Sequence, residues 1–384
     1  MEYIYLDNAA TTKVDPRVKK AVEDFLEECY GNPSSLHRMG RDSAHAVEKA
    51  RVKIADLIGA KEEEIIFTSG GTEADNLAIK GAVGRNEGKH IITSEIEHPA
   101  VYKTCNHLEK HGYDVTYLPV DEYGLIDPEQ FKESIRDDTV LASIIFASNE
   151  IGTIEPIPEM VKIAREHGVL FHTDAVQAVG KLDIDVKKMG IDMLSLSGHK
   201  INAPKGVGAL YVSKKVKLEP LMHGGGHERG LRAGTENVPG IIGLGVACEL
   251  KRKEMSEDIP KMKHLRDRLI SEVLDSVKKV KLNGHPTKRL PNNANFSFDA
   301  VEGESLVLHL DARGIAASTG SACSSTELKP SRTLMATGCG EVEAHSSVRL
   351  TLDKYNTEEE IDYVLKVLPE VVTTLRKMSP LWEE

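Results

Sequence analysis

The chain has 384 residues, and its 40% apolar and 28% charged composition is that of an ordinary globular protein. The formal net charge is −11, which argues against general binding of nucleic acid because phosphates attract clustered cations. No apolar run approaches the roughly 18 residues of a membrane span, and the first residues lack the basic and apolar segments of a signal peptide. We therefore expect neither a nucleic acid nor a membrane as a direct partner.

Five cysteines are spread widely over the chain, at positions 29, 105, 248, 323 and 339. Their odd number and the lack of a Cys-x-x-Cys pair argue against a disulfide framework or a structural zinc site. Cys29, Cys105 and Cys248 lie in helical patterns and are predicted to be small buried hydrophobic residues. We expect a reducing, cytoplasmic compartment.

Residues 50–215 alternate short β-branched runs with helical segments, a pattern typical of a mostly parallel sheet covered by helices on both faces. Ligands of such sheets bind at the carboxyl ends of the strands. The predicted strands are 65–68, 90–94, 115–118, 140–147, 169–172, 193–196 and 208–212, and the predicted helices are 72–83, 99–112 and 159–166.

The pattern changes after a long helical segment at 241–263, which contains Pro260. Two further strands then alternate with two helices, which indicates a smaller α+β unit. These elements are the strands 294–298 and 348–352 and the helices 304–313 and 358–377. We predict an α/β fold with a large domain, residues 13–258, built on a mostly parallel sheet of the seven-stranded type, and a small α+β domain formed by residues 1–12 and 259–384.

Lys200 is the first candidate for chemistry. It follows a predicted strand within the sequence S-L-S-G-H-K (195–200). A lysine that is desolvated at a strand end has a lowered pKa, and its free amine forms Schiff bases. An isolated lysine at such a place is more often a solvated loop residue, so the neighbouring motifs decide the interpretation.

Asp174 ends the apolar strand before Lys200, where a carboxylate is costly unless it is paired. Pyridoxal phosphate supplies such a partner, because an Asp facing its ring nitrogen keeps that nitrogen protonated. Capping of the next helix is the competing explanation.

Two further motifs are weak by themselves. The sequence T-S-G-G-T-E-A (68–74) places two glycines before a helix, an arrangement that suits a phosphate but also an ordinary helix cap. His98, in E-H-P (97–99), follows a strand and offers a flat ring for stacking on an aromatic cofactor, although a lone histidine is usually only a satisfied polar residue.

In chain order, these motifs resemble the class-V aminotransferase group of pyridoxal-phosphate enzymes and, within it, the cysteine desulfurases of the iron–sulfur-cluster assembly type. The resemblance covers essentially the whole chain. It also includes the segments 5–12, 30–35, 148–152, 223–235, 318–325 and 344–349.

The resemblance implies a role for each matching residue. Lys200 holds the cofactor as a Schiff base and shuttles protons. Thr235 reaches the phosphate of a neighbouring subunit, which implies a homodimer. Gly71, Thr72, Ser197 and His199 bind the cofactor phosphate, and His98, Asp174 and Gln177 contact the cofactor ring. Asn149 contacts both the cofactor and the substrate. Arg349 binds the substrate carboxylate through its bidentate guanidinium group.

Cys323 is the candidate nucleophile, in a run of small residues (318–325) without apolar periodicity. Its thiolate is the form that attacks. Cys339, between two glycines, is a rival on local flexibility, but the resemblance favours Cys323. In the family the same cysteine, as a persulfide, also contacts nascent iron–sulfur clusters.

The spacing His223-x3-His227 imitates a zinc site, yet three intervening glycines make the necessary helix improbable, so no metal is expected there.

The implied reaction converts L-cysteine to L-alanine and leaves a persulfide on Cys323. That sulfur then passes to an acceptor protein, an iron–sulfur scaffold or a tRNA-thiolation protein. Two alternatives stay open from the sequence: a selenocysteine lyase, and a sulfur-relay or assembly partner with weak catalysis.

Overall fold

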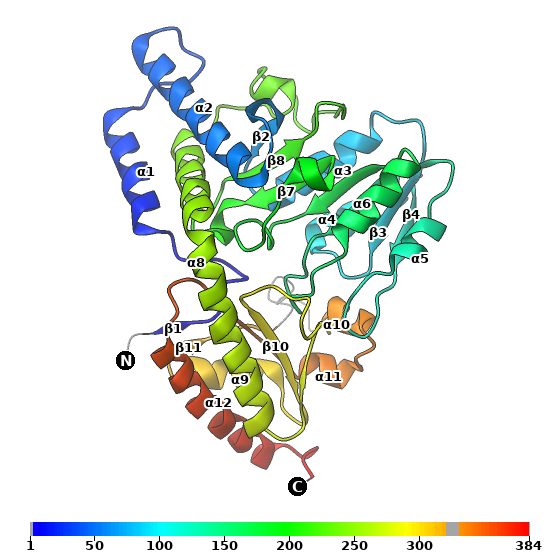
Figure 1. The fold of residues 1–384 in the computed structure, drawn as a ribbon, viewed down its shortest axis with the longest axis vertical. Coiled ribbons are helices and arrows are strands. Elements are labelled where there is room, and N and C mark those ends of the chain that lie inside the picture. The colour runs from blue at the N-terminus through cyan, green and yellow to red at the C-terminus, as the bar shows by residue number, and fades with distance from the viewer. Residues whose placement is uncertain (1–2, 320–329, 384) are drawn as a thin grey trace.

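The computed structural model describes residues 3–319 and 330–383. The elements form a larger upper part and a smaller lower part in Figure 1, and both marked chain ends lie in the lower part. Cys323 lies outside the described residues.

The larger part is built on a seven-stranded sheet with the order β2-β8-β7-β6-β5-β3-β4. Only β8 runs antiparallel to its two neighbours; the other pairings are parallel. The predicted α/β fold with a mostly parallel sheet is therefore confirmed. The strands are β2 (Ile65–Thr68), β8 (Gly208–Val212), β7 (Met193–Ser197), β6 (Leu170–Asp174), β5 (Thr139–Ile145), β3 (His90–Ser94) and β4 (Asp114–Leu118).

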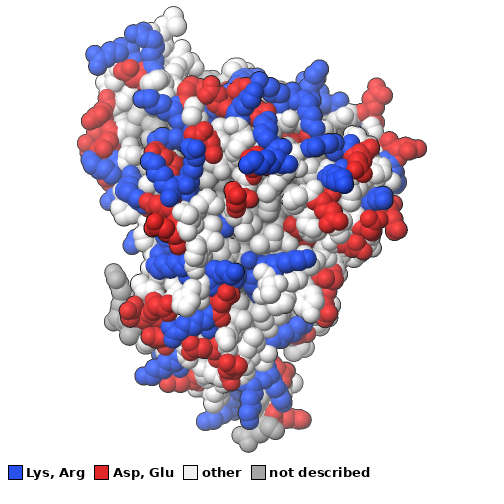
Figure 2. Space-filling view, in the orientation of Figure 1, with Lys and Arg blue, Asp and Glu red and all other residues white. Residues whose placement is uncertain are grey.

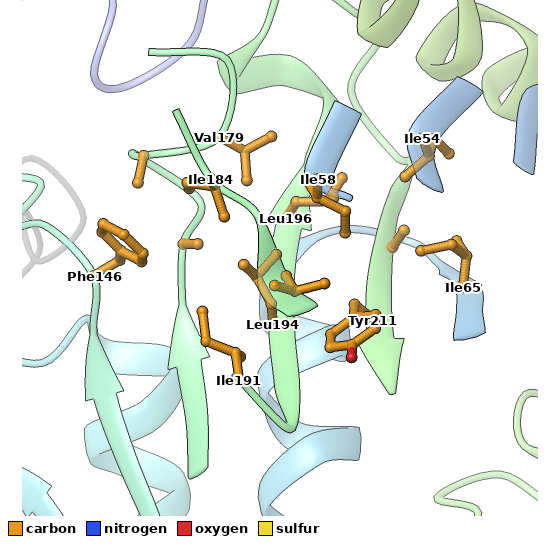
Figure 3. Close-up of a cluster of buried hydrophobic side chains, with 14 of the residues drawn as sticks. Ile54, Ile58, Ile65, Phe146, Val179, Ile184, Ile191, Leu194, Leu196 and Tyr211 are labelled. Atoms are coloured by element: carbon orange, nitrogen blue, oxygen red, sulfur yellow. The ribbon is translucent and has the colours of Figure 1, made fainter. Parts of the chain in front are cut away.

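Helices cover both faces of this sheet because its strands are apolar on both sides. On β7, Met193 packs in the hydrophobic cluster of α3 (Gly71–Val83) and α4 (Pro99–Glu109). Leu194 and Leu196 point to the opposite face, where they meet α2 (Arg38–Ile58), as Figure 3 shows. The helices α6 (Ile157–Glu166) and α8 (Val238–Ser276) also contribute to that second cluster.

The smaller part has its own core, in which Phe296 and Phe298 are fully buried. Its three strands are antiparallel in the order β12-β10-β9, and the first strand of the chain pairs with β11 beside them. The elements are β1 (Ile4–Tyr5), β9 (Val280–Leu282), β10 (Asn293–Phe298), α9 (Gly303–Asp311), β11 (Ile315–Ala316), β12 (Ser347–Thr351) and α12 (Glu358–Met378).

Helix α8 connects the two parts without a linker. Its 39 residues run past the predicted end of the helix at 263 and continue to Ser276. The first turns bury Leu244 in the core of the larger part, and the last bury Leu269 in the core of the smaller part. Pro260 stays within the helix because it is exposed, so that water satisfies the carbonyl that loses its hydrogen bond.

The remaining elements are short or peripheral. Positive and negative side chains are interspersed over the face drawn in Figure 2. Within the described ranges, no helix is both long and apolar enough to cross a bilayer. The remaining elements are α1 (Pro16–Glu28), α5 (Pro128–Glu133), α7 (Val186–Met189), α10 (Arg332–Ala336), α11 (Glu341–His345) and the 3₁₀ turns η1 (Glu62–Glu64), η2 (Gly198–Lys200) and η3 (Glu228–Gly230).

Candidate active site

A cavity of about 290 Å³ lies where β6 and β7 end and α3 begins. A larger, open groove of about 800 Å³ in the smaller part contains none of the predicted site residues that the structure describes. The 290 Å³ cavity, in contrast, brings together ten of the twelve. They are Gly71, Thr72, His98, Asn149, Asp174, Gln177, Ser197, His199, Lys200 and Arg349.

Lys200 lies in η2, directly after β7. It is contacted by a segment near the N-terminus, residues 7–15, which we call the N-terminal strap. Its Nζ donates to the carbonyl oxygens of Ala9 at 2.5 Å and Ala10 at 2.8 Å. The backbone N–H and the hydroxyl of Thr12 both donate to the carbonyl of His199, at 2.8 and 3.0 Å. The strap therefore fixes both the main chain and the amine of the candidate Schiff-base lysine.

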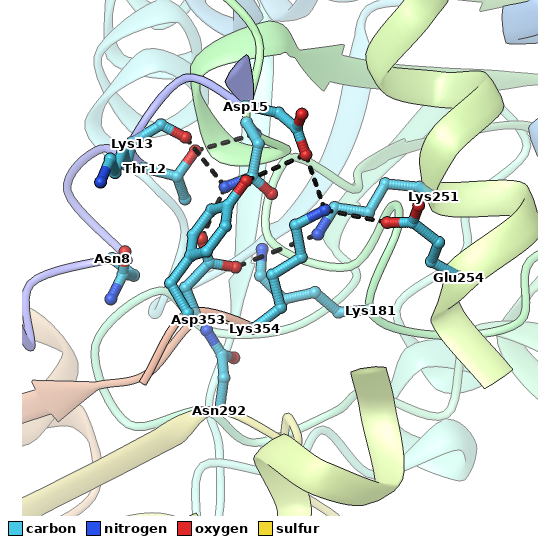
Figure 4. A network of polar contacts seen from close by, with 12 residues as sticks. Asn8, Thr12, Lys13, Asp15, Lys181, Lys251, Glu254, Asn292, Asp353 and Lys354 are labelled. Atoms are coloured by element: carbon cyan, nitrogen blue, oxygen red, sulfur yellow. Dashed lines mark hydrogen bonds and ion pairs between the residues drawn. The ribbon is translucent and has the colours of Figure 1, made fainter. Parts of the chain in front are cut away.

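Residues of a polar network, among them Lys181 and Asp353 in Figure 4, contact the same segment. Lys181 Nζ donates to the carbonyls of Gln177 at 3.2 Å and Lys200 at 3.3 Å, and burial lowers the pKa of Lys181 to about 7. Asn202, held at a φ of 65°, donates from Nδ2 to Asp353 Oδ2 at 2.5 Å. Because Asp353 follows β12, this contact ties the lysine segment to the smaller part of the molecule.

Asp174 and His98 lie at the floor and wall of the cavity. Asp174 is 4% exposed, and burial raises the pKa of its carboxyl group. Its Oδ1 accepts the N–H of Val176 at 3.0 Å, so Asp174 also caps the turn that follows β6. His98 caps α4 through Nδ1, which accepts the N–H of Ala100 at 3.2 Å, and burial lowers the pKa of His98. A neutral imidazole ring therefore borders the cavity.

The N-terminus of α3 provides an anion site beside these groups. Gly70 precedes the helix at a φ of 155°, which side-chain-bearing residues rarely adopt, and gives the helix no side-chain cap. The first N–H groups of the helix, together with its dipole, favour a phosphate. Next to it, burial lowers the pKa of His199 to about 4, so this ring is a neutral hydrogen-bonding group.

Arg349 comes from the middle of β12 in the smaller part and is 3% exposed. Its Nη1 donates to the carbonyl of Asn149 at 2.9 Å, and its Nη2 pairs with Asp7 at 3.0 Å. Its buried Nε has no hydrogen-bond partner among the described residues. A buried cation with an unused donor at a cavity wall suits a carboxylate ligand.

Other residues singled out from the sequence contact the protein itself or lie outside the cavity. The side-chain amide of Gln177 donates to the carbonyl of Ala9 at 2.8 Å, within the protein itself. Thr235 is exposed and does not line the cavity of its own chain. Cys339 is 4% exposed and lies outside the cavity. The segment from His223 to His227 is not helical, so it lacks the geometry of a helical zinc site.

Sequence reasoning missed two acidic residues of the cavity. Asp75 projects from α3 and is 1% exposed. Glu150 follows Asn149, and its carboxylate accepts hydrogen bonds from the hydroxyl groups of Ser331 and Thr333. For Asp75 a signal was present: it is an acidic residue on an otherwise apolar helix face.

Comparisons with known proteins agree with this geometry. The sequence profile of the class-V aminotransferase family matches residues 4–364. A cysteine desulfurase, IscS, of Methanosarcina thermophila is 56% identical over 98% of this chain and 94% of its own length. A solved structure named NifS-like protein has a TM-score of 0.91 at 39% identity, with 97% of this chain and 100% of that chain covered. Another, named SspA in complex with cysteine, has a TM-score of 0.82 at 40% identity, with 92% and 100% covered.

The chain therefore belongs to the class-V aminotransferase family, whose cofactor is pyridoxal phosphate. Within that family it is an enzyme of the cysteine desulfurase type, and neither alternative activity is favoured.

The residues of the cavity fit that cofactor. An amine (Lys200), an uncapped helix N-terminus (Gly71) and a buried carboxyl group (Asp174) line one enclosed space. These are the groups that an aldehyde, a phosphate and a pyridine nitrogen require.

Proposed function

We propose that this chain transfers the sulfur of L-cysteine to Cys323 as a persulfide, releases L-alanine, and passes the sulfur to an acceptor protein in a reducing compartment. The observation that carries the proposal is the joint presence, in one cavity, of Lys200, Asp174 and Arg349. When bound, pyridoxal phosphate supplies the electron sink that stabilises negative charge at the α-carbon.

The protein's own residues have separate roles in the reaction. Arg349 binds the substrate carboxylate, and its contact with Asn149 orients its fork. Lys200 Nζ accepts the α-proton of the substrate and later returns a proton to the product. Asp174, His98 and the start of α3 hold the ring and the phosphate of the cofactor.

The sulfur transfer is balanced without an external oxidant. The Cys323 thiolate attacks the substrate sulfur, an S–S bond forms, and the C–S bond breaks with its electron pair going to the β-carbon. Protonation of that carbon gives the methyl group of alanine. L-cysteine plus a thiol therefore gives L-alanine plus a persulfide.

The partner in sulfur transfer belongs to the same proposal. We expect an iron–sulfur scaffold or a tRNA-thiolation protein as the acceptor, and a homodimer in which Thr235 reaches the partner's cofactor phosphate. The exposed position of Thr235, away from its own cavity, is compatible with a role across a subunit interface.

The decisive experiment compares Cys323→Ala with its control Cys339→Ala after treatment of the holoenzyme with L-cysteine. We expect Cys323→Ala to keep the visible cofactor band and lose alanine formation, because only the nucleophile is removed. Cys339→Ala should keep both. Mass spectrometry should place the added sulfur on the peptide that contains Cys323. If Cys323→Ala forms alanine at the parent rate, the assignment of the nucleophile is wrong.

A further inference from the structure

Asp75 is a buried carboxyl group that the proposed reaction does not use. It lines the cavity from α3 and is 1% exposed, and within residues 3–319 and 330–383 its Oδ1 has no hydrogen-bond partner. One ligand atom each of Asp75, His98 and Asp174 lie within 4.8 Å of one another. Two buried carboxyl groups thus lie close together in the lining of one cavity.

The groups around Asp75 do not supply a positive charge. His172, on β6, has its Nε2 at 3.7 Å from Asp75 Oδ1, but burial lowers the pKa of His172 to about 3, so the ring is neutral. Its two nitrogens are occupied by the hydroxyl groups of Ser143 at 2.8 Å and Ser195 at 3.0 Å. These residues lie on the neighbouring strands β5 and β7.

Burial and the acidic neighbours act against ionisation of Asp75. Burial is the largest cause of the rise in its pKa, Asp174 and Glu97 raise it further, and a hydrogen bond with Ser195 lowers it. Two carboxylates that share a small buried space cannot both ionise at low cost. Asp174 is the member of the pair that carries the charge, because its Oδ1 accepts the N–H of Val176 and because the charge of Lys200 offsets part of the rise in its pKa that burial causes.

We propose that Asp75 and Asp174 form a carboxyl pair that holds a single proton, carried by Asp75, so that the cavity floor presents one negative charge to the ring nitrogen of the cofactor. The pair therefore sets the charge that the cofactor meets. Neutral Asp75 has a proton to donate, and one of its carboxyl oxygens lies within 4.8 Å of a carboxyl oxygen of Asp174. This inference rests on the proposed function for the identity of the cofactor, but the protonation of Asp75 is a property of the protein alone.

The first test is the infrared difference spectrum between the wild-type chain and Asp75→Asn at neutral pH, with and without pyridoxal phosphate. We expect the wild type to show the carbonyl stretch of a protonated carboxylic acid, shifted in D₂O and absent from the variant. The control Asp56→Asn, at an exposed site on α2, should remove only carboxylate bands. Loss of carboxylate bands alone from Asp75→Asn would overturn the inference.

The second test measures the dissociation constant of pyridoxal phosphate for Asp75→Asn and Asp75→Ala. Asn keeps a neutral donor, so we expect wild-type affinity within about twofold and an unchanged absorption maximum. Ala removes the donor and should weaken binding about tenfold. Equal weakening of cofactor binding in both variants would mean that a negatively charged carboxylate was lost. No change in either variant would mean that Asp75 does not act on the site. Each of these two results contradicts the proposed carboxyl pair.

The two proposals fail in different ways. A wild-type chain that binds no pyridoxal phosphate contradicts the proposed function but leaves the infrared result of the cofactor-free protein valid. A wild-type chain that binds the cofactor and lacks the protonated-acid band contradicts only the carboxyl pair. If Asp75→Ala does not fold, the spectra and affinity of Asp75→Asn still decide.

Discussion

The two parts of the molecule contribute to the cavity in different ways. In the larger part, His98 follows β3, Asp174 ends β6 and Lys200 follows β7, so one sheet sets the positions of all three. In the smaller part, Arg349 lies within an antiparallel strand and reaches the cavity from outside that sheet. The cofactor groups are thus fixed locally, whereas substrate binding depends on how the two parts are joined.

The largest expected effect is at the centre of the larger part. Lys200→Ala should abolish turnover and the visible band of the bound cofactor, because the amine that forms the Schiff base is removed. Absorbance of the purified protein and alanine release from cysteine measure these losses. The far-UV circular dichroism should be unchanged. A variant that keeps the band would place the Schiff base on another residue.

Changes at Arg349 should affect the substrate and leave the cofactor in place. Arg349→Gln should lower kcat/KM by about 100-fold, since a buried charge that pairs with the substrate carboxylate is lost. Arg349→Lys keeps the charge without the planar fork and should recover only part of this loss. Steady-state kinetics and the cofactor spectrum distinguish the outcomes. Loss of the cofactor band in either variant would contradict the division between the two parts.

Matched core substitutions test whether the parts unfold together. Phe171→Ala in the larger core and Phe296→Ala in the smaller core should each cost about 3–5 kcal/mol, because both rings are almost fully buried. Urea unfolding should remain a single transition by both cofactor absorbance and circular dichroism, since α8 runs through both cores. Two separate transitions for Phe296→Ala would show that the helix does not couple them.

The smallest effect is on acid stability. His172 is neutral in the folded chain, with its pKa lowered from 6.5 to about 3 by burial. Between these values the unfolded chain binds more protons, so stability is fully present above pH 6.5 and falls as the pH decreases toward 3. The loss should be about 2 kcal/mol at pH 5. Urea unfolding of the cofactor-free protein at several pH values measures it, and His172→Gln should remove this part of the slope.

Local patterns predicted much of the larger part. The strands 65–68, 90–94 and 208–212 match β2, β3 and β8 residue for residue, because β-branched runs between turn residues are short-range signals. Other predictions were less accurate: α4 ends at Glu109 instead of 112, and α1 and α2 were not predicted. The order of the motifs, through the family resemblance, identified the residues that line the cavity.

The sequence by itself determined the class of fold and the chemical types gathered at the strand ends, since the first depends on local pattern and the second on the order of the motifs along the chain. The tertiary structure alone decided which groups meet across long distances. Lys200 contacts the carbonyls of the N-terminal strap, Asn202 contacts Asp353, and Asp75 faces Asp174. These contacts arise from packing between segments far apart in the chain, and burial in that packing raises the pKa values of Asp75 and Asp174, which no local pattern encodes.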